Sequence, residues 1–361
     1  MKNPTHMNDP IRIVVVGCGN MGTSHARAYH AMEGFEITGL VSRSPESREK
    51  LSAELGGYPT FASLGEALSD TPADAVSVNT YPDTHAAIVR EALDAGCHVF
   101  VEKPLALTVE EARELVDLAH KNRLKLVVGY ILRVHPAWSQ FVEIARTLGK
   151  PLVMRMNLNQ QSSGATWYTH RQLMQSMSPI VDCGVHYVDI MCLMTGSRPV
   201  SVSAIGARLS DEIDPEMYNY GQLQVRFEDG SVGWYEAGWG PMVSETAFFI
   251  KDVMGPKGSV SIQDTAAGGS DDVEGHTQTG SLRLHHSATG PDGEFLREDE
   301  IISTADEPDH DGLCRLEQEF FLDAIRNDAD LGDHLRDAVN SLRIVLAADA
   351  SYKSGKTVAI D

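Results

Sequence analysis

The sequence predicts an α/β protein with a doubly wound parallel sheet in its first part and a second α/β domain with an open, mainly antiparallel sheet. Three observations predict this class. Short β-branched runs alternate with helical segments over residues 11 to about 131, which is the spacing of β-α-β units. Beyond residue 150 the apolar runs lengthen and alternate with polar residues, as antiparallel strands with one solvated face do. At 361 residues the chain also exceeds one ordinary core.

The first part contains five predicted strands with helices between them. The strands are "IRIVVV", "FEITGLVSRS", "ADAVSVNTYP", "HVFVEKP" and "KLVVGYI". Four connecting segments have helical composition, and Gly56–Gly57 and Gly96 follow two of them as C-terminal caps. The predicted helices are "NMGTSHARAYHAM", "ESREKLSAELG", "THAAIVREALDAG" and "TVEEARELVDLAHKNR".

The second part begins with the predicted helix "PAWSQFVEIARTLG" and continues with long alternating segments. "EDGS" and "GPKGS" lie between strand-like runs and predict hairpin turns. Residues 264–311 are polar and weakly patterned, which indicates long loops with a short hairpin. Two closing helices are predicted in "RLEQEFFLDAIRN" and "LRDAVNSLRIVLAADASYKSG".

The composition is that of a soluble globular protein, with 42% apolar and 22% charged residues. A formal charge of −21 argues against a general nucleic-acid or anionic-membrane surface but leaves room for a local phosphate pocket. The start "MKNPTHMNDP" lacks the apolar core of a signal peptide, and no run is long enough to span a bilayer. The five cysteines form no CxxC pair, so we expect reduced thiols and a cytoplasmic location.

A glycine motif, Gly17-x-Gly19-x-x-Gly22, follows the first strand and opens the first helix. In that context it predicts a Rossmann dinucleotide site. The three glycines allow a tight turn, close approach of a pyrophosphate and close packing of helix on strand, and the helix N-terminus favours phosphate. Asn20 and Met21 lie within the motif and are expected to contact the cofactor. The alternative is a glycine-rich turn without a ligand.

The end of the second strand favours one dinucleotide over the other. An acidic residue there would bind the ribose 2′-hydroxyl of NAD, but this chain has Ser42 and Arg43. Both could hold a 2′-phosphate through charge-assisted contacts. We therefore expect NADP(H), with NAD(H) as the alternative if Arg43 is only a solvated loop cation.

An unexpected ion pair follows the fourth strand, where "HVFVEKP" ends in Glu102 and Lys103. Strand ends of an open parallel sheet face the ligand crevice at their carboxyl side. Lys103 is therefore expected beside the nicotinamide, where an ammonium can stabilise a developing alkoxide. Thr80 and His85, which follow the third strand, are expected at the same edge. The alternative is a surface salt bridge.

A second polar cluster lies in "SPIVDCGVHYVDIMCLMTG". Asp182, His186 and Asp189 are spaced i, i+4 and i+7, so a single helix would present them on one face. A histidine with a carboxylate one turn away suits a general base near neutral pH. A structural histidine is the alternative.

These motifs together resemble the Gfo/Idh/MocA family of glucose-fructose oxidoreductase and inositol dehydrogenase. The resemblance covers nearly the whole chain, including "GCGNMG", "HVFVEKPLALTVEEA", "GYILRVHP" and "DCGVHYVD". It implies a Rossmann domain over residues 1–132 and a substrate and oligomerisation domain over 133–361. It also implies that the closing helix, 335–353, packs back on the first domain and that the open sheet joins copies into a dimer or tetramer.

The same resemblance implies roles for individual residues. Lys103, preceded by Glu102 and followed by a cis peptide bond, would contact cofactor and substrate, and His186 would be the acid/base that Asp182 orients. Arg133 would help to position the cofactor. Tyr168, with Trp167 and His170, is placed near the substrate by location alone, and these aromatic residues could equally be ordinary loop contacts. Cys97 replaces a lysine common in the family, and Ser42-Arg43 replaces its acidic residue.

We therefore expect hydride transfer between NAD(P) and a secondary alcohol or ketone of a sugar, polyol or cyclitol-like substrate. Two alternatives remain: an NAD-dependent glycosidase with transient oxidation, and a non-catalytic sensor of dinucleotide or sugar. No metal is assigned, because four other histidines lack the spacing of a ligand set. They are His276, His285, His286 and His310.

Overall fold

The computed structural model describes residues 9–244, 249–263 and 279–360. The chain divides into two compact units. The first contains Met1–Ile131 and Asp311–Val339, and the second contains Leu132–His310 and Asn340–Asp361. Each unit is described by itself below.

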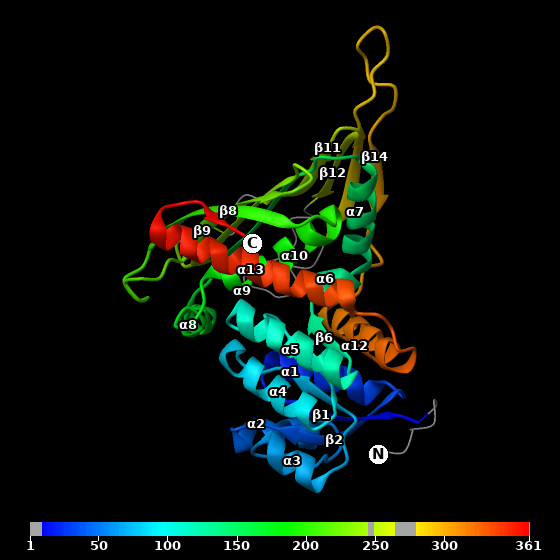
Figure 1. Cartoon of the computed structure of the whole chain (residues 1–361), viewed down its shortest axis with the longest axis vertical. Coiled ribbons are helices and arrows are strands. Elements are labelled where there is room, and N and C mark those ends of the chain that lie inside the picture. The colour runs from blue at the N-terminus through cyan, green and yellow to red at the C-terminus, as the bar shows by residue number, and fades with distance from the viewer. Residues whose placement is uncertain (1–8, 245–248, 264–278, 361) are drawn as a thin grey trace. The chain divides into compact units, whose positions relative to one another are not determined.

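The first unit is built on a parallel sheet of six strands in the order β3-β2-β1-β4-β5-β6. Figure 1 labels β1, β2 and β6 of this sheet. This is the predicted doubly wound sheet, and its order reverses between β1 and β4, where such sheets bind their ligands. The strands are β1 (Ile11–Val16), β2 (Phe35–Val41), β3 (Thr60–Phe61), β4 (Ala75–Val78), β5 (His98–Glu102) and β6 (Leu126–Gly129).

Five α-helices and a 3-10 turn connect these strands, and a helix from late in the chain joins them. The connecting elements are α1 (Asn20–Ala31), α2 (Pro45–Glu54), α3 (Leu64–Asp70), η1 (Pro82–Thr84), α4 (His85–Asp94) and α5 (Val109–Asn122). Phe321 of α12 (His310–Arg326) packs with Phe35 and Phe100, at ring-centroid distances of 6.2 and 6.1 Å. Burial of these rings explains why residues 311–339 belong to this unit.

The sequence prediction missed β3 and α3. The two-residue strand β3 is too short to produce an alternating pattern. Helix α3 has only seven residues, although Ser63 caps it by accepting a hydrogen bond from the N–H of Glu66. Apart from the 3-10 turn η1, the other elements of this unit were predicted.

The second unit contains a nine-stranded sheet in the order β14-β13-β12-β11-β7-β10-β9-β8-β15. Its neighbouring strands pair antiparallel except for β7 with β10, which are parallel. The predicted turns at "EDGS" and "GPKGS" join β9 to β10 and β11 to β12. The strands are β7 (Val153–Gln161), β8 (Pro199–Ala207), β9 (Tyr220–Phe227), β10 (Val232–Gly240), β11 (Lys251–Gly255), β12 (Gly258–Gln263), β13 (Ser281–His286), β14 (Glu300–Ser303) and β15 (Val358–Ala359).

Helices cover one face of this sheet. Tyr187 of α10 stacks on Tyr235 of β10 at 4.9 Å and meets Trp138 of α7 edge-on at 5.9 Å. Gly184 permits the close approach, because a Cβ there would lie 2.9 Å from the Tyr235 ring. The helices of this unit are α6 (Ile131–Val134), α7 (Pro136–Thr147), α8 (Gly164–Leu173), α9 (Pro179–Asp182), α10 (Gly184–Thr195) and the later turns of α13 (Gly332–Ser354).

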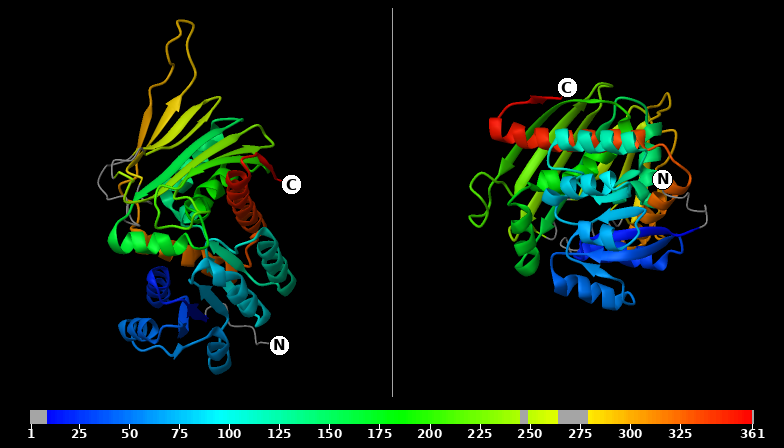
Figure 2. Two further views of the ribbon diagram at one scale, coloured as in Figure 1. Left: turned by 90° about the vertical axis from the view of Figure 1, so that its left-hand side faces the viewer. Right: turned by 60° about the horizontal axis from the view of Figure 1, so that its bottom comes forward.

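The segment between β13 and β14 projects beyond the end of the nine-stranded sheet, as Figures 1 and 2 show. It carries Phe295 and Leu296, which are 60% and 65% exposed. The prediction of a short hairpin within 264–311 is confirmed for β13 and β14, while 264–278 lie outside the described residues.

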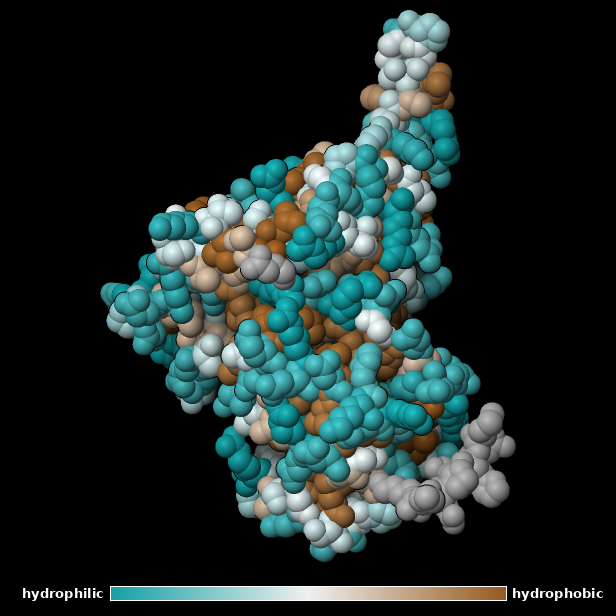
Figure 3. Space-filling view, in the orientation of Figure 1, coloured by the Kyte–Doolittle hydropathy of each residue, from teal (hydrophilic) through white to brown (hydrophobic). Residues whose placement is uncertain are grey.

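Hydrophilic side chains dominate the visible surface in Figure 3, in keeping with the strongly negative net charge. Within the described part of the chain, no helix has both the length and the apolar composition needed to cross a membrane. All five cysteines are buried and unbridged.

Candidate active site

The glycine motif forms a tight turn between β1 and α1. Gly17 has φ +99°, a conformation that favours glycine, and its backbone lies against the carbonyl of Asn79. A Cβ on Gly22 would lie 1.8 Å from the Gly17 carbonyl oxygen, so only glycine fits there. A Cβ on Gly19 would meet nothing within 4 Å. The loop thus presents an open backbone surface at Gly19, which suits a pyrophosphate.

The first helix begins at this loop without a side-chain cap or an acidic residue in its first turn. The positive end of the helix dipole and the first N–H groups of the helix are therefore available to an anion. Burial raises the pKa of the Cys18 thiol to about 11, so the thiol adds no negative charge to the loop at neutral pH. The electrostatics of the loop favour a phosphate.

Two arginines lie near the end of β2, one in the loop that follows it and one on α2. Arg43 is exposed, and Arg48 on α2 donates from Nη1 to the Ser42 carbonyl at 2.6 Å. The Nε of Arg48 is buried and has no hydrogen-bond partner among the described residues. A phosphate oxygen would satisfy such a donor, and sequence reasoning had not identified Arg48.

His85 is fully buried and links two strand ends. Its Nδ1 lies 2.7 Å from the Pro104 carbonyl oxygen, and its Nε2 lies 2.9 Å from that of Thr80. Burial lowers the pKa of His85. Because both ring nitrogens of His85 face backbone carbonyls, the ring offers no donor to a cofactor. His85 can affect a ligand only by positioning the backbone at Thr80 and Pro104. The Lys103–Pro104 peptide bond is cis, as the resemblance implied.

Glu102 is buried behind Lys103 and accepts two hydrogen bonds. His25 Nε2 lies 2.7 Å from its Oε1, and the backbone N–H of Lys103 donates to its Oε2 at 3.2 Å. His25 in turn contacts Gln318 on α12. The side chain of Glu102 therefore holds the backbone from which Lys103 extends.

A second buried carboxyl, Glu317, lies beside this group. Neither of its oxygens has a hydrogen-bond partner among the described residues, and burial together with the charge of Glu102 raises its pKa well above the ordinary value. His25, Cys314 and Glu317 bring potential ligand atoms within 4.8 Å of one another. Both ring nitrogens of His25 already form hydrogen bonds, so the cluster as arranged does not offer three free ligands to a metal.

The polar trio of the second unit differs from the prediction. Asp182 ends α9 and His186 lies in the first turn of α10, because the helix is interrupted at Cys183. The His186 N–H bonds to the Cys183 carbonyl, three residues back. The expectation of one continuous helix was therefore wrong. Asp182 is buried and His186 is half-buried, one helical turn apart along the chain.

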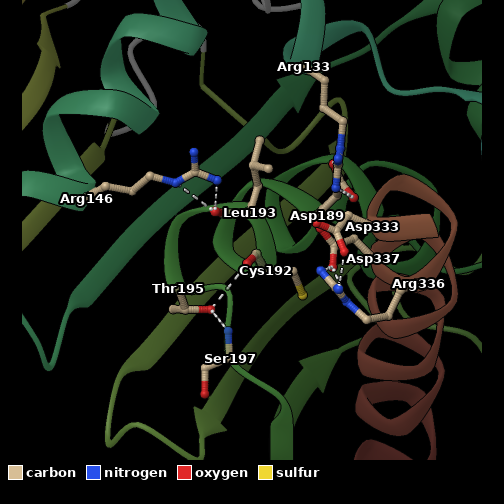
Figure 4. Close-up of polar contacts among 10 residues, drawn as sticks. All are labelled: Arg133, Arg146, Asp189, Cys192, Leu193, Thr195, Ser197, Asp333, Arg336 and Asp337. Atoms are coloured by element: carbon tan, nitrogen blue, oxygen red, sulfur yellow. Dashed lines mark hydrogen bonds and ion pairs between the residues drawn. The ribbon is translucent and has the colours of Figure 1, made fainter. Parts of the chain in front are cut away.

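Asp189, the third member, is fully buried and binds Arg133 (Figure 4). The guanidinium Nε and Nη2 donate to its two carboxylate oxygens at 2.6 and 2.8 Å. This bidentate pair ties α6 to α10. The structure thus gives Arg133 a definite partner within its own unit.

Two buried aromatic rings lie in the region of Asp182. His170 stacks on Trp239 at 4.3 Å, and the Trp239 indole N–H donates to Gln160 Oε1 at 2.6 Å. The Cys183 thiol lies 3.5 Å from both Gln160 Oε1 and Asp182 Oδ2. His170 therefore contributes to packing around this region.

The two neighbouring aromatic residues on α8 behave differently. Trp167 is buried and donates to Glu212, whereas Tyr168 is 58% exposed and lines a surface cavity with Arg171. Of the two, only Tyr168 is open to a ligand.

Of the four other histidines considered above, two lie on β13, His310 begins α12, and one lies outside the described residues. His285 and His286 of β13 pair with Asp299, which precedes β14, and with Glu300, its first residue, at 2.8 and 2.6 Å. His276 lies outside the described residues.

Sequence reasoning missed His25, Glu317 and Gln318, although a signal existed for them. Helix α12 buries Leu313, Cys314, Phe321 and the two polar residues between them on one stripe of three- and four-residue spacing. A carboxyl and an amide within such a stripe must be buried, and buried polar groups need partners.

Two family models match most of this chain. A model described as the oxidoreductase family with an NAD-binding Rossmann fold matches residues 11–130, and a model of the GFO/IDH/MocA C-terminal domain matches residues 144–261. The chain belongs to the Gfo/Idh/MocA oxidoreductase family. The resemblance inferred from the sequence motifs is confirmed.

Two relatives illustrate the range of the Gfo/Idh/MocA family. UDP-N-acetylglucosamine 3-dehydrogenase of Acidithiobacillus ferrooxidans is 32% identical over 212 residues, which cover 56% of this chain and 61% of that protein. The scyllo-inositol 2-dehydrogenase (NAD(+)) of Bacillus subtilis is 27% identical over 372 residues, covering 98% of each chain.

Solved structures share the fold at low identity. An NAD binding oxidoreductase from Klebsiella pneumoniae has a TM-score of 0.80 and 19% identity, covering 98% of this chain and 99% of the other. The Acidithiobacillus ferrooxidans enzyme has a TM-score of 0.76 and 23% identity, covering 96% and 98%. Both sheets of the predicted architecture are therefore those of the family.

Proposed function

We propose that this chain is an NADP(H)-preferring dehydrogenase or reductase that acts on a secondary alcohol or ketone of a sugar, polyol or cyclitol. The observation that carries the proposal is the location of Lys103, directly after β5 at the carboxyl edge of the parallel sheet. Named relatives act on a sugar nucleotide and on scyllo-inositol, which supports this substrate class.

The preference for NADP(H) rests on the cations after β2. Arg43 is exposed, Arg48 has a buried Nε without a partner among the described residues, and no acidic residue follows the strand to bind a 2′-hydroxyl. Two guanidinium groups would bind a 2′-phosphate, whereas NAD would leave them unused. NAD(H) remains the alternative cofactor, since one relative is named for NAD(+).

The cofactor supplies the hydride chemistry, and the protein supplies position, charge and one proton transfer. Lys103 would hydrogen-bond the substrate hydroxyl and stabilise the alkoxide that develops as hydride leaves. His186 would take the hydroxyl proton as general base, and buried Asp182 would hold the imidazole in the proper orientation. Thr80, Glu102 and the glycine loop would frame the nicotinamide and the phosphates.

The first experiment is a fluorescence titration of the purified protein with NADPH and with NADH. Tighter NADPH binding that is lost in Arg43→Ala and in Arg48→Ala is expected. Equal or tighter binding of NADH would contradict the cofactor assignment and leave the role of Lys103 standing.

The second experiment screens sugars and polyols, including scyllo-inositol and UDP-N-acetylglucosamine, for a change in nicotinamide absorbance. Turnover that is lost in Lys103→Met and reduced in His186→Ala is expected. Hydrolysis of a glycoside without net absorbance change would instead favour the glycosidase alternative.

We also propose that the protein is a cytoplasmic homo-oligomer joined through the nine-stranded sheet. Val153 and Val232 are register partners there, and Ile205, which is 64% exposed, lies on the same face through Gln222 and Glu236. An exposed apolar sheet face favours contact with another copy. Sedimentation velocity is expected to give a dimer or tetramer that Ile205→Lys dissociates, and a monomeric wild type would contradict this.

A further inference from the structure

A chain of buried hydrogen bonds leads from α1 and α12 to the backbone of Lys103. The Tyr29 hydroxyl donates to Gln318 Oε1 at 2.5 Å, and Gln318 Nε2 donates to His25 Nδ1 at 2.9 Å. His25 Nε2 then donates to Glu102 Oε1 at 2.7 Å, and Glu102 Oε2 accepts the N–H of Lys103 at 3.2 Å.

The donor and acceptor roles of these hydrogen bonds are consistent with one another. Because the tyrosine hydroxyl donates to the carbonyl end of Gln318, the amide NH₂ of Gln318 faces His25. His25 Nδ1 is therefore the accepting nitrogen, and its Nε2 carries the proton that Glu102 accepts. Both oxygens of Glu102 therefore serve as acceptors in this arrangement.

The residues of this hydrogen-bond network are buried. Tyr29, His25 and Gln318 are 0% exposed and Glu102 is 8% exposed, so water cannot readily replace a lost link. Glu317 lies against the same group, facing His25, Tyr29, Cys314 and Glu102. Burial, together with the negative charge of Glu102, raises the pKa of Glu317 well above its ordinary value.

The position of Glu317 follows from the sheet register. Glu102 pairs with Gly129 across β5 and β6, and a Cβ on Gly129 would lie 3.5 Å from Glu317 Oε1. A glycine opposite Glu102 therefore leaves room for the second carboxyl.

We propose that His25 and Gln318 are positioning residues for Lys103, acting through the carboxylate of Glu102. This inference rests on the proposed catalytic role of Lys103. His25 holds one oxygen of Glu102 while the other accepts the N–H of Lys103, and Gln318 sets the tautomer of His25 that makes this contact.

Two substitutions of His25 separate this role from packing. His25 also meets Phe100 edge-on at 4.9 Å, so a purely structural ring would be replaced best by Phe. His25→Gln keeps an N–H donor toward Glu102 but loses the ring, whereas His25→Phe keeps the ring and loses the donor. His30→Gln, at an exposed position of the same helix, is the control.

The test measures kcat and KM with the sugar or polyol turned over fastest in the screen, and measures NADPH affinity by fluorescence. His25→Phe is expected to lower kcat by about tenfold, as the loss of buried hydrogen bonds at a positioning group does, with NADPH affinity within about threefold of wild type. His25→Gln is expected to retain kcat within about threefold, and His30→Gln to match wild type.

The opposite order, with His25→Phe more active than His25→Gln, would overturn the inference. If either variant fails to fold, Gln318→Met tests the same chain from α12: lower kcat with NADPH affinity retained supports the inference, and wild-type kcat overturns it. Lys103→Met is measured beside them. If Lys103→Met turns over like wild type, the proposed function itself fails, whereas an inactive Lys103→Met with wild-type His25→Phe refutes the positioning role alone.

Discussion

The imidazole Nδ1 of His85 lies 2.7 Å from the carbonyl oxygen of Pro104, the residue that follows Lys103. Its other nitrogen faces the Thr80 carbonyl at 2.9 Å. On one side of Lys103, the Pro104 carbonyl thus contacts buried His85. On the other side, the Glu102 side chain contacts buried His25 and accepts the N–H of Lys103. Lys103 extends from a segment that the unit holds on each side.

Replacement of His85 by Phe is expected to lower the free energy of unfolding at pH 7 by about 1–2 kcal/mol, because the buried carbonyl contacts are lost. Burial lowers the pKa of His85, so the folded state binds its proton less readily than the unfolded state does. Wild-type stability is therefore lost as pH falls below about 6.5, the ordinary value for histidine. His85→Phe does not titrate there.

The difference in unfolding free energy between wild type and His85→Phe should therefore shrink from pH 7 to pH 5 in urea denaturation. His30→Gln, on the exposed side of α1, serves as the control for a histidine substitution. A difference that grows toward pH 5 would contradict the sign of this linkage.

Alanine at two glycines of the dinucleotide loop is expected to reduce stability by different amounts. A Cβ at Gly22 would lie 1.8 Å from the Gly17 carbonyl oxygen, so Gly22→Ala should lower the free energy of unfolding by about 1–3 kcal/mol. A Cβ at Gly19 meets nothing within 4 Å, so Gly19→Ala should cost less than about 1 kcal/mol.

For cofactor affinity, the larger effect is expected at Gly19. Gly19→Ala should weaken NADPH binding by about tenfold or more, because the Cβ occupies the surface that a pyrophosphate would approach. Thermal unfolding and NADPH titration of the two variants check both halves. A Gly19→Ala protein with wild-type affinity would argue that no pyrophosphate lies there.

Removal of Arg133 is expected to destabilise the second unit strongly. The Asp189 carboxylate is 1% exposed and accepts two hydrogen bonds from the guanidinium. Arg133→Met should lower the free energy of unfolding by about 3–5 kcal/mol, the usual cost of breaking a buried pair. Urea denaturation of Arg133→Met beside the double variant Arg133→Met/Asp189→Leu should show the double variant to be the less destabilised. A double variant destabilised more than Arg133→Met would contradict the expectation that Arg133→Met leaves an uncompensated buried carboxylate.

Replacement of Glu317 by Gln is expected to change the pH dependence of stability. Burial and the charge of Glu102 raise the pKa of Glu317 well above 4.5, so the folded state keeps a proton that the unfolded state releases. Wild-type stability therefore falls as pH rises above that value, by up to about 1.4 kcal/mol per pH unit. Glu317→Gln lacks this loss.

Relative to wild type, Glu317→Gln should become more stable from pH 5 to pH 8 in urea denaturation. Glu319→Gln, at an exposed position two residues further along α12, is the matched control and should not show this trend. A Glu317→Gln protein that loses relative stability toward pH 8 would indicate an ionised, stabilising carboxylate.

Sequence patterns predicted much of the fold because those patterns are local. β-Branched composition identifies buried strands of four to seven residues, and the spacing of the glycines identifies the glycine loop. The two-residue β3 has no such pattern, and the break at Cys183 has none either, since its backbone stays near helical values. The helical spacing of Asp182, His186 and Asp189 was visible, but the partner of Asp189, Arg133, lies 56 residues away.

The sequence by itself determined the family, the two kinds of sheet and the location of Lys103 at a strand end, because each depends on residues close together in the chain. Only the tertiary structure decided which polar groups surround the strand that ends in Glu102. Gln318 and His25 are 293 residues apart, and they meet because Phe321 buries α12 against the aromatic side chains of the first sheet. Apolar burial brings the helix there, and the hydrogen bonds that buried polar groups require then set their order.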